Sequence, residues 1–136
     1  MKTTQIICSE FPPGPGGIGE HANNLAGQLS KNNFRVSVIC PKAKIYSTQK
    51  TSRLKNINIY RYKDYRLIKI ITIIYKLIKQ YIANSKTIVI SSGQIPLIIV
   101  GCMNLLLKND CIAILHGHEI LMGKKIKLFF VKYSLN

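Results

Sequence analysis

The chain has 136 residues, of which 20 are Lys or Arg and 5 are Asp or Glu, so its formal net charge is +15 at pH 7. This length predicts one domain and excludes two full domains with a cleft between them. The charge favours anions in general, whether nucleic acid, acidic lipid or phosphorylated small molecules, and does not choose among them. A compositional bias toward lysine explains the excess of basic residues as well as selection for anion binding does.

The opening residues and the cysteines predict a cytoplasmic protein with reduced thiols. The apolar stretch in "MKTTQIICSEF" is far shorter than the roughly 7–15 apolar residues of a signal peptide. The densest apolar segment, 95–107, falls below the roughly 18 residues that cross a bilayer. The four cysteines form no C-x-x-C pair and lie in or beside apolar runs, as small buried side chains do.

Short β-branched runs alternate with helix-length segments along the chain. The runs predict strands at 5–8, 35–40, 57–62, 87–91 and 111–115. Helices are predicted over 18–31, 66–82 and 95–108, and the polar, basic segment 41–56 is predicted to be a flexible loop. Most strand runs are continuously apolar, which is typical of strands covered on both faces. The sequence therefore predicts an α/β domain with a Rossmann-like doubly wound parallel sheet of about five strands and helices on both faces.

The segment 66–82 separates polar and apolar residues onto two faces. Its polar face consists of Lys69, Thr72, Lys76 and Lys79, and its apolar face of Leu67, Ile70, Ile71, Ile74, Leu77, Ile78 and Tyr81. Because strands flank this helix, we expect its apolar face to pack on the sheet. The same pattern suits an interfacial membrane helix, and its lysines, with others over 124–132, can draw the domain to the anionic inner face of the membrane.

The stretch "EFPPGPGGIGEH", 10–21, joins the first strand to the first helix with very little side-chain bulk. Bare backbone can approach a ligand closely, and the start of a helix aims unpaired N–H groups and a positive dipole at it. Such a turn favours an anion, and phosphate above all. A turn that is simply tight is the structural alternative.

A dinucleotide-binding domain is one alternative for this turn. Gly14, Gly16 and Gly19 satisfy G-x-G-x-x-G, but Pro15 removes a backbone donor inside the turn. The acid expected about 20 residues further on is replaced by "CPKAK". NADP remains open, because a lysine of that stretch can contact a phosphorylated ribose. No nucleic acid is expected, since the chain has neither a known motif nor basic residues interleaved with aromatic ones.

Two motifs resemble one enzyme family. The stretch "EFPPGPGGIGEHANNLAGQLSKNNFRVSVIC" is similar to the opening of family four GT-B glycosyltransferases, and "AILHGHE", 113–119, resembles the exit from the fifth strand in that family. The resemblance implies the N-terminal, acceptor-side domain of a retaining glycosyltransferase that moves a sugar from a nucleotide-sugar to a glycan or lipid-linked acceptor. It implies no metal and no cofactor, because the nucleotide-sugar is a substrate.

The resemblance also implies roles for individual residues. Gly16, Gly17 and Ile18 would face the diphosphate or the sugar of the donor, and His116 would be catalytic, beside the transferred sugar. In a sheet of order 3-2-1-4-5 the loops after the first, fourth and fifth strands are neighbours, so the remaining polar residues converge on one edge. The acceptor side would then include Glu10, His21, Ser92, Gly93, His118 and Glu119.

Some of these residues have a purely structural role as an alternative. His116 can be a histidine that is hydrogen-bonded to a neighbouring loop, and Glu119 can cap a helix. A zinc site made of Cys111, His116 and His118 is disfavoured, because the spacing matches no usual site and a fourth ligand is missing.

The resemblance covers the whole chain, 1–136, but only the front of the family's protein. The half that holds most of the nucleotide-sugar in that family has no counterpart, and the first domain lacks its last strands. We therefore expect a single domain that is incomplete at its C-terminal end and has negligible activity alone. A truncated gene, a subunit completed by a separate C-terminal domain protein and a stand-alone binding module are the open explanations, and the unclosed end at "VKYSLN" favours truncation. A non-catalytic module that binds anions or membrane surfaces is the competing class of function.

Overall fold

The computed structural model describes residues 2–14, 16–42 and 57–116. Five strands form one sheet in the order β3-β2-β1-β4-β5, and every neighbouring pair is parallel. The elements in chain order are β1 (Thr3–Cys8), α1 (Gly17–Lys31), β2 (Arg35–Pro41), β3 (Ile57–Tyr62), α2 (Arg66–Ala83), β4 (Ile88–Ser92), α3 (Gln94–Leu107) and β5 (Cys111–Ile114).

This architecture confirms the predicted Rossmann-like α/β fold. Each predicted strand and helix lies within about two residues of its observed bounds, which is the usual uncertainty of element ends. Of the predicted loop 41–56, Pro41 belongs to β2 instead, because it pairs with Tyr62 of β3. Residues 43–56 lie outside the described part of the chain, so the loop itself stays a prediction.

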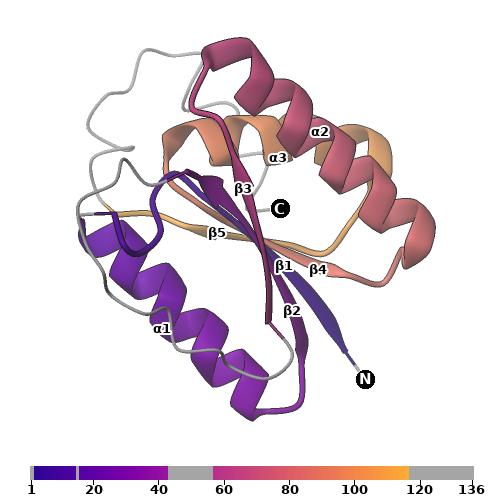
Figure 1. Cartoon of the computed structure of the whole chain (residues 1–136). Helices are drawn as coiled ribbons and strands as arrows, with labels where there is room; N and C mark the ends of the chain where they lie inside the picture. The colour runs from indigo at the N-terminus through magenta and orange to yellow at the C-terminus, as the bar shows by residue number, and fades with distance from the viewer. Residues whose placement is uncertain (1, 15, 43–56, 117–136) are drawn as a thin grey trace.

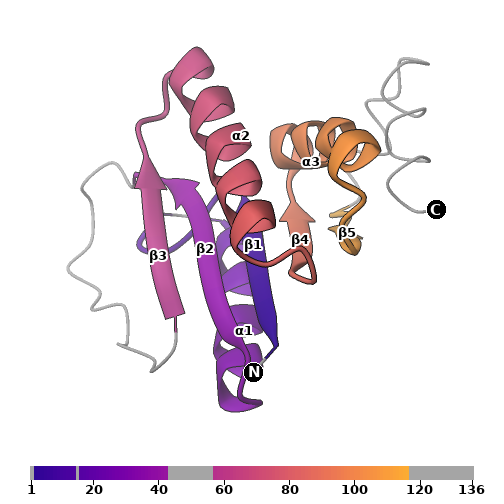
Figure 2. The same cartoon turned by 90° about the vertical axis from the view of Figure 1, so that its right-hand side faces the viewer.

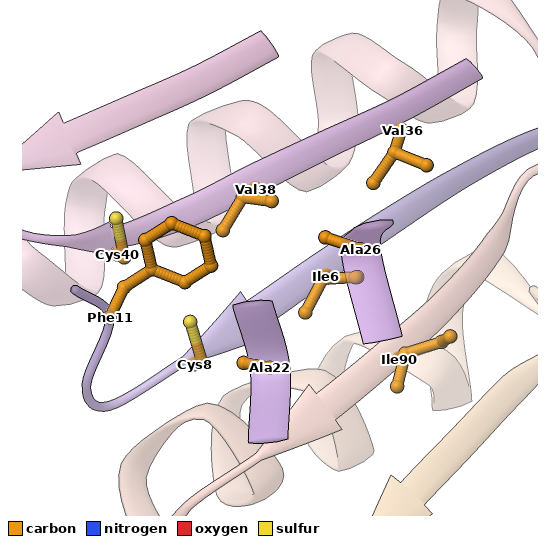
Figure 3. Close-up of a cluster of buried hydrophobic side chains, with 9 residues drawn as sticks. All are labelled: Ile6, Cys8, Phe11, Ala22, Ala26, Val36, Val38, Cys40 and Ile90. Atoms are coloured by element: carbon orange, nitrogen blue, oxygen red, sulfur yellow. The ribbon is translucent and has the colours of Figure 1, made fainter. Parts of the chain in front are cut away.

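Helices cover both faces of the sheet. Figures 1 and 2 show α1 on one face, with α2 and α3 side by side on the other. Because side chains alternate along a strand, Ile6 and Cys8 of β1 point toward α1 whereas Ile7 points toward α2 and α3. Figure 3 shows the core under α1, where Ala22 and Ala26 bring the helix close to the sheet. This two-sided burial explains why the strands are continuously apolar.

The packing of α2 corrects one expectation. Ile73 and Leu77 are its buried residues, and Ile70 and Ile74 pack beside them, so only part of the predicted apolar face lies on the sheet. A second stripe is exposed to solvent, namely Leu67, Ile71, Ile78 and Ile82. Meanwhile Lys69 of the predicted polar face is only 16% exposed and pairs with Asp64 at 2.7 Å. The helix has apolar residues on two sides, and the sheet can cover only one of them.

No helix within the described residues is both long enough and apolar enough to cross a membrane. The apolar helix α3 is instead a layer of the domain, with Ile99 and Val100 buried against the sheet and α2. The prediction that segment 95–107 does not span a bilayer agrees with this finding.

Candidate functional site

The carboxyl ends of β1, β4 and β5 lie next to one another. Cys8 at the end of β1 is level with Ser92 of β4, and Ser92 is level with Ile114 of β5. The next residue of the chain continues this pairing, because the Ser9 amide donates to the Ser92 carbonyl at 3.1 Å. The loops that follow these three strands therefore start from one edge of the sheet, at the point where the strand order reverses.

The glycine loop between β1 and α1 needs its glycines for different reasons. Gly16 has a φ of 124°, and the Glu10 carboxylate lies where a Cβ of residue 16 would be. Gly19 packs against the backbone of Phe11. A Cβ added at residue 19 would lie 3.1 Å from the Phe11 backbone nitrogen. Gly17 differs from both, because no atom of the described residues lies within 4 Å of the position its Cβ would take. The bare surface at Gly17 is therefore open to a ligand.

Contacts with β3 fix the first residues of the loop to the sheet. Phe11 is buried at 3% exposure, and the Arg61 guanidinium of β3 lies 5.9 Å from the centre of its ring. The same guanidinium donates to the Pro12 carbonyl at 2.6 Å. Inside the loop, the Gly14 amide donates to the Phe11 carbonyl at 3.1 Å. These contacts hold the loop against β3 and orient the start of α1.

A second close contact joins the β4–α3 turn to the end of β1. Gly93 has a φ of 96°, and the Ser9 side chain lies where a Cβ of residue 93 would be. Only glycine combines this backbone conformation with so close a neighbour. The turn brings the start of α3 beside the start of the glycine loop.

His116, just after β5, is contacted by side chains of β4 and α1. Its Nε2 lies 2.8 Å from the Ser92 Oγ, and Ser92 is 1% exposed. The His21 ring of α1 meets the His116 ring edge-on, with 5.7 Å between the ring centres. The imidazole therefore has a defined position between β4 and α1.

These loops border a cavity of about 490 Å³ that is open to solvent, which we call the carboxyl-end cavity. Its lining residues are Ser9, Gly17, Ile18, Gly93, Gln94, Ile95 and His116. The described lining contains no lysine, arginine or carboxylate, so it can offer backbone amides, two neutral polar side chains and one imidazole. Such a site suits a hydroxyl-rich ligand and one phosphate at the start of α1.

The structure brings some of the predicted residues into this cavity and leaves others beside it. Gly17, Ile18, Gly93 and His116 line it. Ser92 and His21 contact His116 from behind. Gly16 and Glu10 lie against each other and are not among the lining residues, so a role for them stays a prediction. His118 and Glu119 fall outside the described residues.

Sequence reasoning missed three lining residues, namely Ser9, Gln94 and Ile95. Ser9 directly follows the last residue of β1, and Gln94 follows the turn after β4. Such positions expose a side chain at this edge of a parallel sheet. The place of Gln94 in "SSGQ" was therefore a usable signal. Ile95 gives no such signal, because a helical isoleucine is normally a core residue.

The thiols near this edge are poor nucleophiles. Cys8 and Cys40 are fully buried in the core under α1, as Figure 3 shows. Burial raises the pKa of Cys40 to about 11 and that of Cys8 further in the same direction. Burial also raises the pKa of Cys111, in β5, to about 11. Because the thiolate is the reactive form, none of the three fits a catalytic role at neutral pH.

Within the described ranges, no three His, Cys, Asp or Glu side chains lie close enough together to hold a metal ion. His21 and His116 are near each other, and the Ser92 hydroxyl is one polar partner of His116.

Comparison of the sequence with known families and curated proteins gives no match. No protein-family model matches the chain, and no curated protein matches its sequence significantly. The fold is thus shown by the coordinates, whereas the resemblance to glycosyltransferases rests on the two sequence motifs.

Proposed function

We propose that the carboxyl-end cavity binds a nucleotide-sugar and that the chain is the acceptor-side domain of a retaining glycosyltransferase. In this proposal a C-terminal donor-binding domain completes the enzyme, which moves a sugar to a glycan or lipid-linked acceptor. The observation that carries the proposal is that open Gly17 and His116, almost 100 residues apart in sequence, line one cavity. Those are the two positions to which the family resemblance assigns donor contact and catalysis.

The start of α1 supplies the donors for a phosphate. The first helical hydrogen bond runs from the Glu20 amide to the Gly16 carbonyl, and no side chain caps the helix. The amides of Gly17 and Ile18 therefore precede the helical ladder, and they belong to residues that line the cavity. The helix dipole adds roughly half a positive charge at this end. A phosphate group satisfies the donors and the dipole together.

The neutral lining agrees with an acceptor-side role. Stabilising a departing diphosphate takes cations in a closed, water-poor site, and the described lining residues include none. In the family that the motifs resemble, those cations belong to the second domain. The first domain is then left with sugar hydroxyls and a single phosphate contact, which the described lining suits.

His116 is the side chain placed to act on a sugar hydroxyl. Ser92 and His21 fix its ring, while the cavity gives it a surface to meet a ligand. A fixed imidazole can hydrogen-bond a hydroxyl of the transferred sugar and favour one orientation over others. His116 is therefore the residue we expect to affect sugar orientation more than phosphate affinity.

Isothermal titration calorimetry of the full chain with UDP-glucose and GDP-mannose tests the proposal. Gly17→Val should weaken binding by about tenfold or more, because a branched side chain fills the space used by the phosphate. Gln28→Val, at an exposed position near the other end of α1, is the matched control and should bind normally. Absence of heat with either nucleotide-sugar at millimolar concentration would contradict the proposal.

The role of His116 needs its own comparison. His116→Ala should weaken binding of the nucleotide-sugar while leaving binding of the nucleotide alone unchanged. His116→Asn can still hydrogen-bond Ser92 and should recover part of the loss. An equal loss for the sugar-bearing and sugar-free ligands would remove the proposed contact with the sugar.

A second candidate function is binding to a membrane surface, and the exposed stripe on α2 favours it. Leu67, Ile71 and Ile82 are 72%, 66% and 79% exposed, and they lie on one side of a helix in a strongly basic chain. Apolar side chains in a row, in a positively charged protein, are what an interfacial helix uses. Such binding is compatible with a lipid-linked acceptor and would not need the carboxyl-end cavity.

Co-sedimentation with vesicles of anionic lipid tests this second function. The Ile71→Ser/Ile82→Ser double variant should reduce the bound fraction severalfold, and about 0.5 M salt should reduce it further through screening. Leu105→Ser, an exposed leucine of α3, serves as the control. Equal sedimentation of both variants and the wild-type chain would exclude the α2 stripe as the contact.

A further inference from the structure

A second cavity lies at the opposite end of the sheet, where β1, β2 and β3 begin. It has a volume of about 530 Å³ and lies between these strands and the C-terminal half of α2, which Figure 2 shows in front of the sheet. We call it the amino-end pocket. Its lining residues are Thr3, Gln5, Arg35, Ser37, Asn58, Tyr60, Lys76, Lys79, Gln80, Ala83 and Asn84.

The floor of this pocket is a polar row across three strands. Gln5 of β1 is level with Ser37 of β2, and Ser37 is level with Asn58 of β3. On the same sheet face, one step further along the strands, Ile7 and Ile39 belong to the apolar core. The face therefore changes from apolar to polar where α2 passes over it, and packing alone gives no reason for that change.

Two members of the row each carry a buried oxygen that has no hydrogen-bond partner among the described residues. The Gln5 amide nitrogen donates to the Lys76 carbonyl at 3.5 Å, which leaves Oε1 as an acceptor without a donor. The Ser37 hydroxyl likewise has no partner among the described residues. Gln5 is 2% exposed, and an unsatisfied buried polar group reduces folding stability. A polar ligand or water in the pocket would supply the missing partners.

The walls of the pocket are cationic. Arg35, Lys76 and Lys79 line it, and none of its described lining residues is acidic. The Lys76 ammonium lies 3.6 Å from the centre of the Tyr60 ring, so it is held at the pocket wall. Within the described ranges the one ion pair is between Lys69 and Asp64, so the charges of Arg35 and Lys79 are not neutralised by a carboxylate there.

We propose that the amino-end pocket binds a small phosphorylated polyol, of which a sugar phosphate is the simplest example. The phosphate pairs with Arg35 and Lys79 at the rim. The hydroxyl groups of the ligand hydrogen-bond to the polar row. They enter at exposed Asn58 and reach Ser37 and Gln5 after small rotations of these two side chains. The volume lies within the range of about 300–1,000 Å³ that small-molecule sites occupy.

This site is independent of the carboxyl-end cavity. The two cavities share no lining residue, and they lie at opposite ends of the parallel strands. A regulatory ligand or a second substrate can therefore occupy the amino-end pocket without touching the proposed nucleotide-sugar site. Failure of either proposal leaves the other unchanged, because different variants test them.

Nuclear magnetic resonance of the full chain with glucose 6-phosphate tests the site directly. Amide shifts are expected at Gln5, Ser37 and Asn58 and along 76–84, whereas glucose without phosphate should cause much smaller shifts. Lys79→Ala and Arg35→Ala should each weaken binding about tenfold, as expected for a lost charge-assisted hydrogen bond. Lys31→Ala on α1, an exposed lysine on the other face of the sheet, is the control.

Gln5→Met separates binding from folding. It keeps the side-chain volume and removes the unpartnered oxygen, so the variant should fold and lose most of its affinity for glucose 6-phosphate. Inorganic phosphate should bind this variant as it binds the wild-type chain, because the rim cations remain. No shift at the pocket with glucose 6-phosphate at about 20 mM, or unchanged affinity in both Lys79→Ala and Gln5→Met, would overturn the proposal.

The phosphorylated polyol can be free or can be the headgroup of a lipid. Vesicles that contain phosphatidylinositol 4-phosphate distinguish these sources. Binding to vesicles that Lys79→Ala abolishes and Ile71→Ser preserves would assign a lipid headgroup. Binding of glucose 6-phosphate without such vesicle binding would assign a free sugar phosphate.

Discussion

The two ends of the sheet carry opposite kinds of cavity. The carboxyl-end cavity is lined by glycines, small polar side chains and one imidazole, with no charged lysine or arginine among its described lining. The amino-end pocket has three cations and a row of amide and hydroxyl groups. A net charge of +15 would lead one to look for the cations at the glycine loop. The cations that line a cavity in the described part of the chain lie instead on α2 and at the start of β2, so net charge gives no guide to where an anion binds.

The largest expected difference is between two glycines that line the carboxyl-end cavity. Gly93→Ala should lower the free energy of unfolding by about 4 kcal/mol, because φ is 96° and the Ser9 side chain lies where the new methyl group would be. Urea denaturation measures the loss. Gly17→Ala is the control and should change the free energy by less than about 1 kcal/mol, because its surroundings are open. Equal losses would mean that Gly17 is needed for the fold and is not a ligand contact.

The wall of the amino-end pocket depends on how α2 is anchored. Leu77→Ala should lower the free energy of unfolding by about 3 kcal/mol, since Leu77 is 2% exposed in the core between α2 and the sheet. Ile71→Ala, on the exposed stripe, should cost less than about 0.5 kcal/mol. Thermal or urea unfolding compares the two. A large loss at Ile71 would show that the stripe is covered in solution.

Alkaline pH should weaken the core beneath the glycine loop. Burial raises the pKa of Cys40 from 9.0 to about 11 and raises those of Cys8 and Tyr62 in the same direction. At pH values between the unfolded and the folded pKa, the unfolded chain binds fewer protons than the folded chain. The contribution of the Cys40 thiol to stability is therefore fully present below about pH 9 and is lost as pH rises through about 11. We expect Cys40 alone to lower the free energy of unfolding by about 2 kcal/mol from pH 8 to pH 11, and the other two groups add to this loss.

The same titration has an internal control. Cys40→Ala removes one of the buried thiols and should flatten the loss, while Cys102→Ala, at an exposed cysteine, should leave the pH dependence as it is. Urea unfolding at several pH values measures both. An identical slope in Cys40→Ala and wild type would assign the alkaline loss to other groups.

The smallest expected effect is at the floor of the amino-end pocket. Without ligand, Gln5→Met should raise the free energy of unfolding by about 1 kcal/mol, because the substitution removes an unpartnered buried oxygen. Chemical denaturation in phosphate-free buffer provides the value. A loss of stability of more than about 1 kcal/mol would show that the Gln5 amide is satisfied in the folded chain.

The fold could be predicted because its signals are local. Continuous β-branched runs such as 35–40 can be buried on both faces, and the segments between them have helical length, so strand type and sheet type follow together. The meeting of the glycine loop with the turn at Gly93 then follows from the topology, since parallel strands end at one edge. Which glycine is open to a ligand could not be predicted, because it depends on where Glu10 and Ser9 point.

The orientation of α2 and the amino-end pocket lay beyond sequence reasoning. Ile73 is fully buried although it is not on the predicted apolar face, whereas Ile71, which is on that face, is 66% exposed. The helix has isoleucines on both of these sides, so the pattern does not show which side packs on the sheet. The polar row joins Gln5, Ser37 and Asn58, which are far apart in sequence and are aligned only by strand register. Single polar residues in apolar strands are common, so none of them signals a site by itself.

The central claim is that open Gly17 and His116 form one wall that receives a nucleotide-sugar. Amide shift mapping of the full chain with UDP-glucose tests it most directly. The account predicts shifts at 16–18, 93–95 and 116, with Gln5 and the amides over 76–80 unchanged. Shifts confined to the amino-end pocket, or no shifts at saturating ligand, would contradict it.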